Sequence, residues 1–250
     1  MRIGTWNVNS ARSRWDRVLG VLERHDLDVL GLQETKMKEV PVEMTESLKA
    51  RGYEMAHVGY NQWNGVALIS RVGLEDVQTH FEGQPSYDGT MEGRAISAIC
   101  DGLRIWSLYI PNGRAIDHPH YHYKLQFLYN FARYAAPSTD VAMGDFNVIP
   151  TDSDVFDPTA MTTHVTEPER QAFQLVTDVL PVVSPAEYTY WDYKGGAFYA
   201  DHGMRIDFQL SPHTVTRAWV DRDERAAKSS DHAPLICDYA APVSAPDTAG

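Results

Sequence analysis

The sequence predicts an α/β protein in which two packed β-sheets are flanked by helices. Three observations support this: apolar runs of strand length are numerous, a few amphipathic helices stand between them, and turn residues separate the runs. The 250 residues can bury a large core, and we expect a single domain over residues 1–240. The Pro/Ala-rich residues 241–250 are predicted to form a disordered tail.

The chain opens with the pattern of a strand–helix–strand unit. Residues 2–9 form an apolar run that ends in two amides, residues 15–22 repeat apolar side chains at helical spacing, and residues 28–34 form a second apolar run that ends in an acid. The crossover makes the two strands parallel, so their ends meet at one rim. We therefore expect Asn7 and Glu34 to be neighbours in space.

Successive strands and hairpins come next. A short helix ends at Gly52, and Asn-Gly or Asp-Gly turns stand between several of the runs. The last run ends in Tyr109, with Pro111 and Asn112 just beyond, so it also delivers polar groups to a strand end; a structural tyrosine before a Pro turn fits equally well. The expected strands cover residues 53–57, 65–70, 74–80, 95–100 and 104–109.

The middle of the chain contains an amphipathic helix around residues 121–132 and then a buried strand that ends at Gly144-Asp145. If strand geometry persists to Asn147, the side chains of Asp145 and Asn147 leave on the same face and can address one ligand. The alternative is a plain turn in which Asn147 caps the next segment of the chain.

The last third begins with a capping box at residues 166–169, which predicts a helix. A strongly aromatic strand is expected at residues 188–193, and another at residues 203–210 contains Asp207, an acid in an apolar pattern that needs a partner. The final strands are expected at residues 215–220 and after the Asp231-His232 pair. The side chains expected to face inward from the helix are Ala172, Leu175, Val176 and Val179.

Composition and charge narrow the function. The chain carries 22 Lys and Arg against 34 Asp and Glu, a net charge of −12. This argues against broad electrostatic attraction to nucleic acid, but it suits an enzyme that uses carboxylates to bind a divalent cation. No apolar run approaches the roughly 18 residues of a membrane helix, no signal-peptide pattern opens the chain, and Cys100 and Cys237 lie in apolar runs. We expect a soluble, cytoplasmic protein that does not associate with membranes.

The polar residues at the strand ends indicate the chemistry. Carboxylates and amides, with little sulfur or imidazole, suit a hard octahedral cation such as Mg²⁺ or Mn²⁺, and such cations usually act on phosphate. One imidazole among several acids can act as a base or, when protonated, stabilise charge on a phosphoryl oxygen. The set comprises Asn7, Glu34, Tyr109, Asp145, Asn147, Asp207, Asp231 and His232.

Two other chemistries are disfavoured by the sequence. Ser229 and Ser230 precede Asp231-His232, but no Gly-x-Ser-x-Gly elbow of a serine hydrolase occurs. The sequence also has no Gly-x-x-x-x-Gly-Lys-Ser/Thr loop, which argues against ATP-dependent phosphoryl transfer.

Seven segments together resemble the exonuclease III branch of the endonuclease/exonuclease/phosphatase superfamily, in order from residue 2 to about residue 239. The resemblance implies a four-layer α/β sandwich of the DNase I-like type and Mg²⁺-dependent phosphodiester hydrolysis. It also implies DNA repair: cleavage 5′ to abasic sites and 3′-to-5′ degradation of duplex DNA. The segments are Trp6-Asn7-Val8-Asn9, Leu32-Gln33-Glu34-Thr35-Lys36, Gly65-Val66-Ala67-Leu68, Tyr109-Ile110-Pro111-Asn112-Gly113, Gly144-Asp145-Phe146-Asn147, Arg205-Ile206-Asp207 and Ser230-Asp231-His232-Ala233-Pro234.

The resemblance also implies roles for single residues. Glu34 is expected to be the principal metal ligand, with Asn7 and Asp231 close to the ion, which is Mg²⁺ or alternatively Mn²⁺. The catalytic set is treated as one unit, and which of its members is the base stays open.

Within the catalytic set, Asp145 is expected to position or activate the attacking water. His232, oriented by Asp207, is expected to face the scissile phosphate. Asn147 and Tyr109 are expected to contact the phosphate.

Substrate contacts are also implied. Asn112, Lys36 and Arg205 are expected to contact phosphate or DNA. A small apolar pocket for a flipped abasic sugar would be lined by Tyr190, Trp191, Met204 and Ile206. Packing of an aromatic strand in the core is an equally good interpretation of Trp191. Candidates for a local phosphate track, or for solvated surface charges, are Arg12, Arg14, Lys36, Lys38, Arg94, Arg114, Lys124, Lys194 and Arg205.

The sequence therefore predicts a monomeric DNA-repair nuclease that acts on double-stranded DNA, especially abasic or 3′-blocked DNA. The alternatives are a member of the same superfamily that hydrolyses another phosphoester, such as RNA or a phosphomonoester, and a catalytically silent DNA-binding protein. The silent protein would require the loss of a catalytic group, and the complete set is present.

Overall fold

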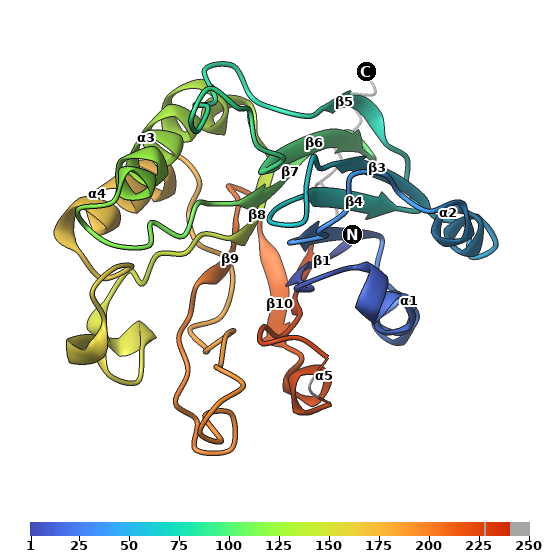
Figure 1. The fold of residues 1–250 in the computed structure, drawn as a ribbon. Coiled ribbons are helices and arrows are strands. Elements are labelled where there is room, and N and C mark those ends of the chain that lie inside the picture. Colours follow the sequence, from blue (N-terminus) through green and yellow to red (C-terminus); the bar gives the residue numbers. More distant parts are fainter. Residues whose placement is uncertain (228, 241–250) are drawn as a thin grey trace, which may run out of the picture.

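Two mixed β-sheets form the centre of the protein in a computed structural model that describes residues 1–227 and 229–240 (Figure 1). The first sheet has the strand order β10-β11-β1-β2-β4-β3, and the second has the order β5-β6-β7-β8-β9. The strands of the first sheet are β1 (Arg2–Asn7), β2 (Val29–Gln33), β3 (Glu54–Val58), β4 (Val66–Ser70), β10 (Val215–Val220) and β11 (Leu235–Tyr239). Those of the second are β5 (Glu75–Gln78), β6 (Ala95–Cys100), β7 (Leu103–Tyr109), β8 (Val141–Asp145) and β9 (Asp207–Leu210).

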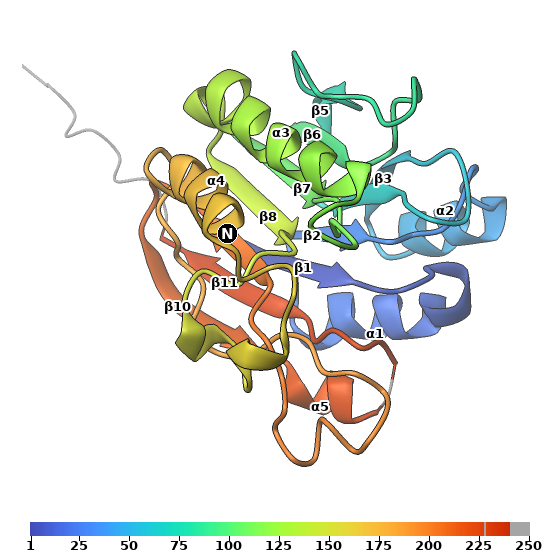
Figure 2. The same ribbon diagram turned by 60° about the vertical axis from the view of Figure 1, so that its left-hand side comes forward.

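Helices cover the outer face of each sheet, which gives four layers. Figures 1 and 2 show α1 and α2 beside the first sheet and α3 and α4 beside the second. One buried apolar cluster joins each helix pair to its sheet, and a third fills the space between the sheets. The predicted arrangement is therefore confirmed. The helices are α1 (Trp15–Arg24), α2 (Val42–Lys49), α3 (Pro119–Tyr134), α4 (Glu167–Thr177) and α5 (Arg222–Ala226), with 3₁₀ turns at Arg12–Arg14, Ala136–Ser138, Asp152–Asp154 and Pro158–Ala160.

The registers of the central strands bring polar residues to one edge of the protein. In the first sheet, parallel strands β1 and β2 end together, with Asn7 paired to Gln33. In the second, Tyr109 at the end of β7 is paired with Asp145 at the end of β8, which is paired in turn with Asp207 at the start of antiparallel β9. Strands β1 and β2 pack against β7 and β8, so these ends meet.

Helix α4 buries Ala172 and Val176 as predicted, but the rest of its buried face differs from the prediction. The expectation that Leu175 and Val179 face inward is wrong, because these side chains are 43% and 40% exposed. Phe173 is buried instead, and its ring centroid lies 5.4 Å from that of Phe146 and 4.9 Å from that of Phe208. An aromatic ring buries more area than an aliphatic side chain, so its packing fixes the rotation of the helix.

The aromatic run at residues 188–193 is not the predicted strand. Tyr190 forms isolated bridges with Met204 on one side and with His232 on the other. Bonds to two separate partners leave no continuous ladder, and the neighbouring strand begins only at Asp207. The run therefore acts as a link between the segment that carries His232 and the segment before β9.

The termini and cysteines add three facts. The predicted disordered tail, residues 241–250, lies outside the described residues. Cys100 and Cys237 are free and buried in the core, as expected. Within residues 1–227 and 229–240, no helix combines the length and the apolar character needed to cross a bilayer.

Candidate active site

Asn7 links the two sheets where their central strands end. Its Nδ2 donates to Glu34 Oε1 at 2.9 Å and to Asp145 Oδ2 at 3.0 Å. The expected proximity of Asn7 and Glu34 is therefore present, and Asp145 is the third member of the group. Asn7 and Asp145 are buried, so the amide fixes both carboxylates at the edge of the sheets.

Gly144 allows the backbone to bring Asp145 to this position. Its φ is +144°, and a Cβ at this residue would lie 1.9 Å from the carbonyl oxygen of Leu108. No side chain fits such an approach between β8 and β7, so the position requires glycine.

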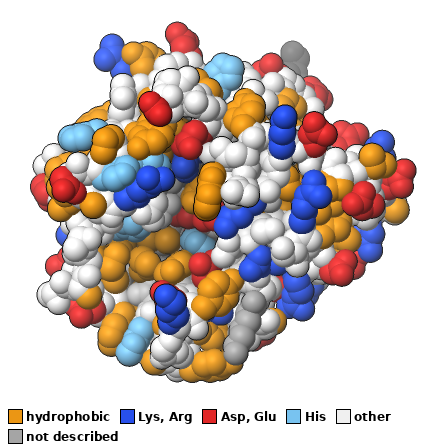
Figure 3. Space-filling view, in the orientation of Figure 1, with side chains coloured by type: hydrophobic (Ala, Val, Ile, Leu, Met, Phe, Trp, Pro, Cys, Tyr) orange, Lys and Arg blue, Asp and Glu red, His pale blue; other side chains and the backbone are white. Residues whose placement is uncertain are grey.

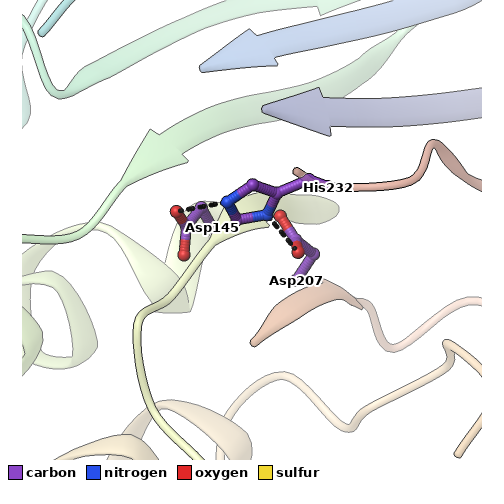
Figure 4. Close-up of side chains that lie close together, drawn as sticks. All are labelled: Asp145, Asp207 and His232. Carbon is purple, nitrogen blue, oxygen red and sulfur yellow. Dashed lines mark hydrogen bonds and ion pairs between the residues drawn. The ribbon is translucent and has the colours of Figure 1, made fainter. Parts of the chain in front are cut away.

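His232 is oriented by Asp207, as Figure 4 shows. Its Nδ1 lies 2.8 Å from Asp207 Oδ2, and its Nε2 lies 3.8 Å from Asp145 Oδ2. Thr189, which no sequence motif marks, donates its hydroxyl to Asp207 Oδ2 at 2.6 Å and accepts the Asp207 backbone N–H at 3.1 Å. Asp207 Oδ2 therefore has two partners, whereas Oδ1, also buried, has no hydrogen-bond partner among residues 1–227 and 229–240.

Burial and neighbouring charges shift the protonation of His232 and Asp145. Burial disfavours the imidazolium, but the carboxylates of Asp207, Asp145 and Asp231 outweigh it and raise the pKa of His232 to about 10. Burial raises the pKa of Asp145 to about 7, and the negative charges of Asp207 and Glu34 act in the same direction. At neutral pH His232 is therefore cationic, and Asp145 is near the midpoint of its titration.

Glu34 is shifted in the opposite direction. Burial alone would raise its pKa, but the Asn7 amide and the charges of Lys36 and His232 lower the pKa of Glu34 below its ordinary value. Lys36 Nζ lies 3.2 Å from Glu34 Oε2 and donates to Asn9 Oδ1 at 2.6 Å. Glu34 is therefore an anion at neutral pH.

Left-handed backbone turns several side chains into the site. A non-glycine residue with left-handed backbone angles costs about 1–3 kcal/mol of folding free energy, and such residues are concentrated at functional sites. Around this site, examples follow the ends of β1, β2 and β8, and one more, His164, contacts Asn147. They are Asn9 (φ 46°), Glu34 (φ 51°), Lys36 (φ 54°), Asn147 (φ 51°) and His164 (φ 75°).

The strand does not persist to Asn147, so the same-face geometry is wrong. The Asn147 backbone N–H instead donates to Asp145 Oδ1 at 3.0 Å, which closes a local turn. The side chain donates from Nδ2 to the Ile110 carbonyl at 2.9 Å, and its Oδ1 lies 3.1 Å from His164 Nε2 and 3.4 Å from Asn112 Nδ2. Asn112 and Asn147 are therefore adjacent, and the buried His164, which no sequence pattern indicates, holds the amide in place.

Tyr109 presents a protonated hydroxyl at the same edge. Burial, together with the charge of Glu34, raises the pKa of Tyr109 well above its ordinary value. The guanidinium of Arg94 lies 4.8 Å from the centre of the Tyr109 ring and is paired with Glu92. A cavity of about 460 Å³ next to these residues is also lined by Asn112. Tyr109 can therefore donate to a ligand oxygen at neutral pH.

Lys124 supports the site from inside the protein. It is fully buried, and its Nζ pairs with the equally buried Glu169 and donates to the carbonyls of Asn147 and Asn112. The sequence indicates Glu169 only as part of a capping box, and Lys124 only as a surface or phosphate-track cation. Burial requires the charge to be paired, so Lys124 anchors the two asparagine segments rather than lining the surface.

The remaining cations divide into two groups. Arg94 and Lys124 are buried in ion pairs, and Arg205 pairs with Asp154 at 3.3 Å and donates to a carbonyl. Figure 3 shows acidic and histidine side chains in the hollow at the centre of one face, with Lys and Arg side chains around it. The exposed cations from the predicted track are Arg12, Lys38, Arg114 and Lys194, with Arg14 and Lys36 half-buried.

The predicted pocket residues fall into two places. Tyr190, Met204 and Ile206 share one apolar cluster, and the Tyr190 ring stands edge-on to His232 with centroids 5.0 Å apart. Trp191 is fully buried in a different cluster, and its indole N–H donates to Asp201 Oδ1 at 3.1 Å. Three of the four residues therefore lie together, with Tyr190 against His232, and Trp191 belongs to a separate part of the core.

The oxygen donors at this edge fit a hard divalent cation. Glu34 and Asp145 accept from the same amide group, so the two carboxylates lie close together, and a cation bound beside them would offset their repulsion. Asp231 is held nearby through Asn9, at 3.4 Å. Asp145, Asp207 and His232 also place possible ligand atoms within 4.8 Å of one another. The imidazole of His232 is cationic, however, so neither of its nitrogens is free to bind a metal ion.

Comparisons with known proteins agree with one another. The model of the Endonuclease/Exonuclease/phosphatase family matches residues 4–232. The chain is 27% identical over 273 residues to exodeoxyribonuclease III of Haemophilus influenzae, which covers 96% of this chain and 100% of the relative.

Solved structures give the same result. A 3′-5′ exonuclease from Neisseria meningitidis is 32% identical, with a TM-score of 0.87 and coverage of 96% of this chain and 99% of the other. An AP endonuclease from Archaeoglobus fulgidus is 30% identical, with a TM-score of 0.86 and coverage of 96% and 100%.

Proposed function

The chain belongs to the endonuclease/exonuclease/phosphatase family, and from this premise we propose that it is a metal-dependent DNA-repair nuclease. It hydrolyses phosphodiester bonds in double-stranded DNA, 5′ to abasic sites, from 3′ ends, or both. The observation that carries this proposal is the Asp145–His232–Asp207 group, joined through Asn7 to Glu34.

The protonation states suit hydrolysis of a phosphodiester. A cationic His232 stabilises negative charge that develops on a phosphoryl oxygen. Asp145, whose pKa is near neutrality, can orient a water molecule and accept its proton. Asp207 and Thr189 keep the imidazole in one orientation, so that its Nε2 stays directed toward Asp145.

Glu34, Asn7 and Asp231 are the residues that would hold Mg²⁺ or Mn²⁺, and the ion would supply positive charge to the phosphate. We propose that Tyr109, Asn112 and Asn147 contact the phosphate. The Lys124 ion pair keeps the two asparagine segments at a fixed separation.

The apolar group of Tyr190, Met204 and Ile206 supports recognition of an abasic sugar. Tyr190 of this group contacts His232, and we propose that a sugar without a base docks on the group next to the reacting phosphate. We propose that residues 1–240 act as one unit, since the site takes residues from both sheets. We also propose that the protein is a monomer and is cytoplasmic, the latter in keeping with its free cysteines.

The test is cleavage of a labelled duplex that contains one abasic-site analogue, with Mg²⁺ or with a chelator. An intact duplex and an RNA strand of the same sequence serve as parallel substrates. Metal-dependent incision at the analogue supports repair activity, and shortening of the intact duplex reports the exonuclease. If neither DNA is cut, the proposal fails; cleavage of RNA alone would assign the site to another phosphoester.

A further inference from the structure

A cavity of about 340 Å³ lies between residues 192–199 and helix α5. Figures 1 and 2 show the loop after residue 190 (orange) beside α5. Tyr193, Phe198 and Tyr199 line the cavity together with Arg225, and none of the four belongs to the catalytic group. The volume is at the lower end of the range for small-molecule sites, so it suits a ligand the size of a single base.

Arg225 is a buried cation whose hydrogen bonds are incomplete. Its side chain is 3% exposed, and its Nη2 donates to the carbonyls of Trp191 at 2.8 Å and Asp192 at 3.4 Å. Within residues 1–227 and 229–240, Nε has no hydrogen-bond partner and no carboxylate pairs with the guanidinium. Burial of such a charge is unfavourable, so a ligand rich in acceptor atoms would be bound well here.

Aromatic rings flank this cation. The Cζ atom of Arg225 lies 5.2 Å from the ring centres of both Tyr193 and Phe198. Tyr199 is 75% exposed at the mouth of the cavity. Proteins hold unpaired bases in this way, with a ring or guanidinium plane on the face of the base and donors at its edge. A phosphate alone would leave the aromatic surfaces unused.

The cavity lies close to the proposed position of the scissile phosphate. The ring of Tyr190 contacts His232, and the three residues from Tyr190 to Tyr193 span at most about 11 Å. Arg14 makes a second connection, because it donates to the Asn9 carbonyl and its Nη2 lies 3.4 Å from the Tyr193 hydroxyl. One DNA strand can therefore reach both places.

We propose that this cavity is a second nucleotide subsite, which takes an unpaired base of the DNA strand next to the bond that is cleaved. The inference rests on the proposed nuclease function and deepens it. The base stacks on Tyr199 or Tyr193 and accepts hydrogen bonds from Arg225. The enzyme then prefers DNA that offers an unpaired nucleotide, such as a mismatched 3′ end, to DNA that is paired throughout.

The test compares two duplexes of equal length, one fully paired and one with a mismatched 3′ terminal nucleotide carrying 2-aminopurine. Binding is measured with Mg²⁺ in the Asp145→Asn background, in which cleavage is slow compared with the binding measurement. Replacement of Tyr199 by Ala should weaken binding of the mismatched duplex about fivefold or more and leave the paired duplex unchanged. The 2-aminopurine fluorescence of the bound complex should rise as stacking is lost.

Tyr129→Ala, which removes an exposed aromatic side chain on α3, is the matched control and should change neither duplex. Because Arg225 is buried, Arg225→Lys serves only as a second variant. It should weaken binding of the mismatched duplex in the same way. Equal effects of Tyr199→Ala on both duplexes would overturn the subsite. So would concentration-dependent self-association of the wild type that Tyr199→Ala abolishes, because the surface would then be an interface between copies.

Cleavage by the wild-type chain distinguishes failure of the subsite from failure of the proposed nuclease function. If it cleaves neither duplex with Mg²⁺, the nuclease function fails. If it cleaves both, and Tyr199→Ala binds and cleaves them with wild-type preference, only the subsite is rejected.

Discussion

Two carboxylates that accept hydrogen bonds from the same amide group differ in their affinity for protons. Asn7 Nδ2 donates to Glu34 and Asp145, but the pKa of Glu34 lies below its ordinary value, whereas burial raises that of Asp145 to about 7. Lys36 stands beside Glu34, while Asp145 is more deeply buried and faces the charge of Asp207. The surroundings therefore make one acid a permanent anion and the other a proton acceptor, although both end a central strand.

Removal of the proton acceptor should have the largest effect. Asp145→Asn keeps the shape of the side chain but cannot take a proton, so the rate of DNA cleavage should fall by roughly 10²–10⁴-fold. His232→Ala should lower the cleavage rate by a factor in the same range. The double variant should cleave little more slowly than either single variant, because the group acts as a unit. Rates are measured on the abasic duplex, and thermal unfolding checks the fold.

Glu43→Gln is the control for these variants, because Glu43 is an exposed acid on α2, a helix on the outer side of the first sheet (Figure 1). It should cleave at the wild-type rate. Wild-type rates in Asp145→Asn or His232→Ala would remove these residues from the site.

Replacement of Glu34, the acid that stays charged, should mainly lower the affinity for the metal ion. Glu34→Gln should weaken binding of Mg²⁺ by about 100-fold or more, since even the loss of a residue that only supports a ligand costs 10–100-fold. Calorimetric titration of Mg²⁺ into the protein measures this without any reaction. Asp145→Asn should weaken binding less than Glu34→Gln, and the reverse order would contradict the division of roles between the two acids.

The pH dependence should show the raised proton affinities directly. Asp145 must be deprotonated and His232 protonated, so cleavage should rise as Asp145 loses its proton and fall at higher pH as His232, whose pKa is raised above that of a free histidine, loses its own. Asp207→Asn removes the carboxylate that stabilises the imidazolium, so the alkaline limb should move to lower pH by about one pH unit or more.

NMR titration of the His232 imidazole in Asp207→Asn gives a reading that does not depend on turnover. An unchanged alkaline limb, with an unchanged imidazole titration, would show that Asp207 does not control His232.

The smallest expected effect concerns the apolar side of His232. Met204→Ala enlarges the space that Tyr190, Met204 and Ile206 share, so the ratio of cleavage at an abasic site to cleavage of intact DNA should change by about tenfold, with little change in unfolding temperature. Leu175→Ala, an exposed apolar residue on α4, is the control. A constant ratio would mean that Met204 only packs against its neighbours.

Much of the fold and of the site could be predicted because the signals are local. Apolar runs of strand length that end in Asn7, Glu34 and Asp145 report both burial and the point where burial stops, and Asp207 is marked as an acid inside an apolar pattern. The motifs around these residues supported the family. The structure then places three of them in one hydrogen-bonded group, with His232 on Asp207.

Other features depend on which distant segments meet, and no local pattern reports that. Thr189 joins the site because the run at residues 188–193 lies between two other segments instead of forming a strand. Lys124 has the sequence context of a surface cation in an amphipathic helix, yet it is buried against Glu169, 45 residues further along the chain. Phe173 is buried and Leu175 is exposed, contrary to the helical pattern, because the Phe173 ring packs against two other aromatic rings.

By itself, then, the sequence determined the strand pattern, the polar residues at the strand ends and the family. Only the tertiary structure decided that Glu34 stays charged, that the pKa of Asp145 is raised, and that Arg225 is buried without a carboxylate partner among the described residues. The physical reason is that a pKa and the cost of burying a charge are set by the dielectric surroundings and by charges within a few ångströms. Contacts such as that between Asn7 and Asp145, 138 residues apart, exist only once the sheets have packed.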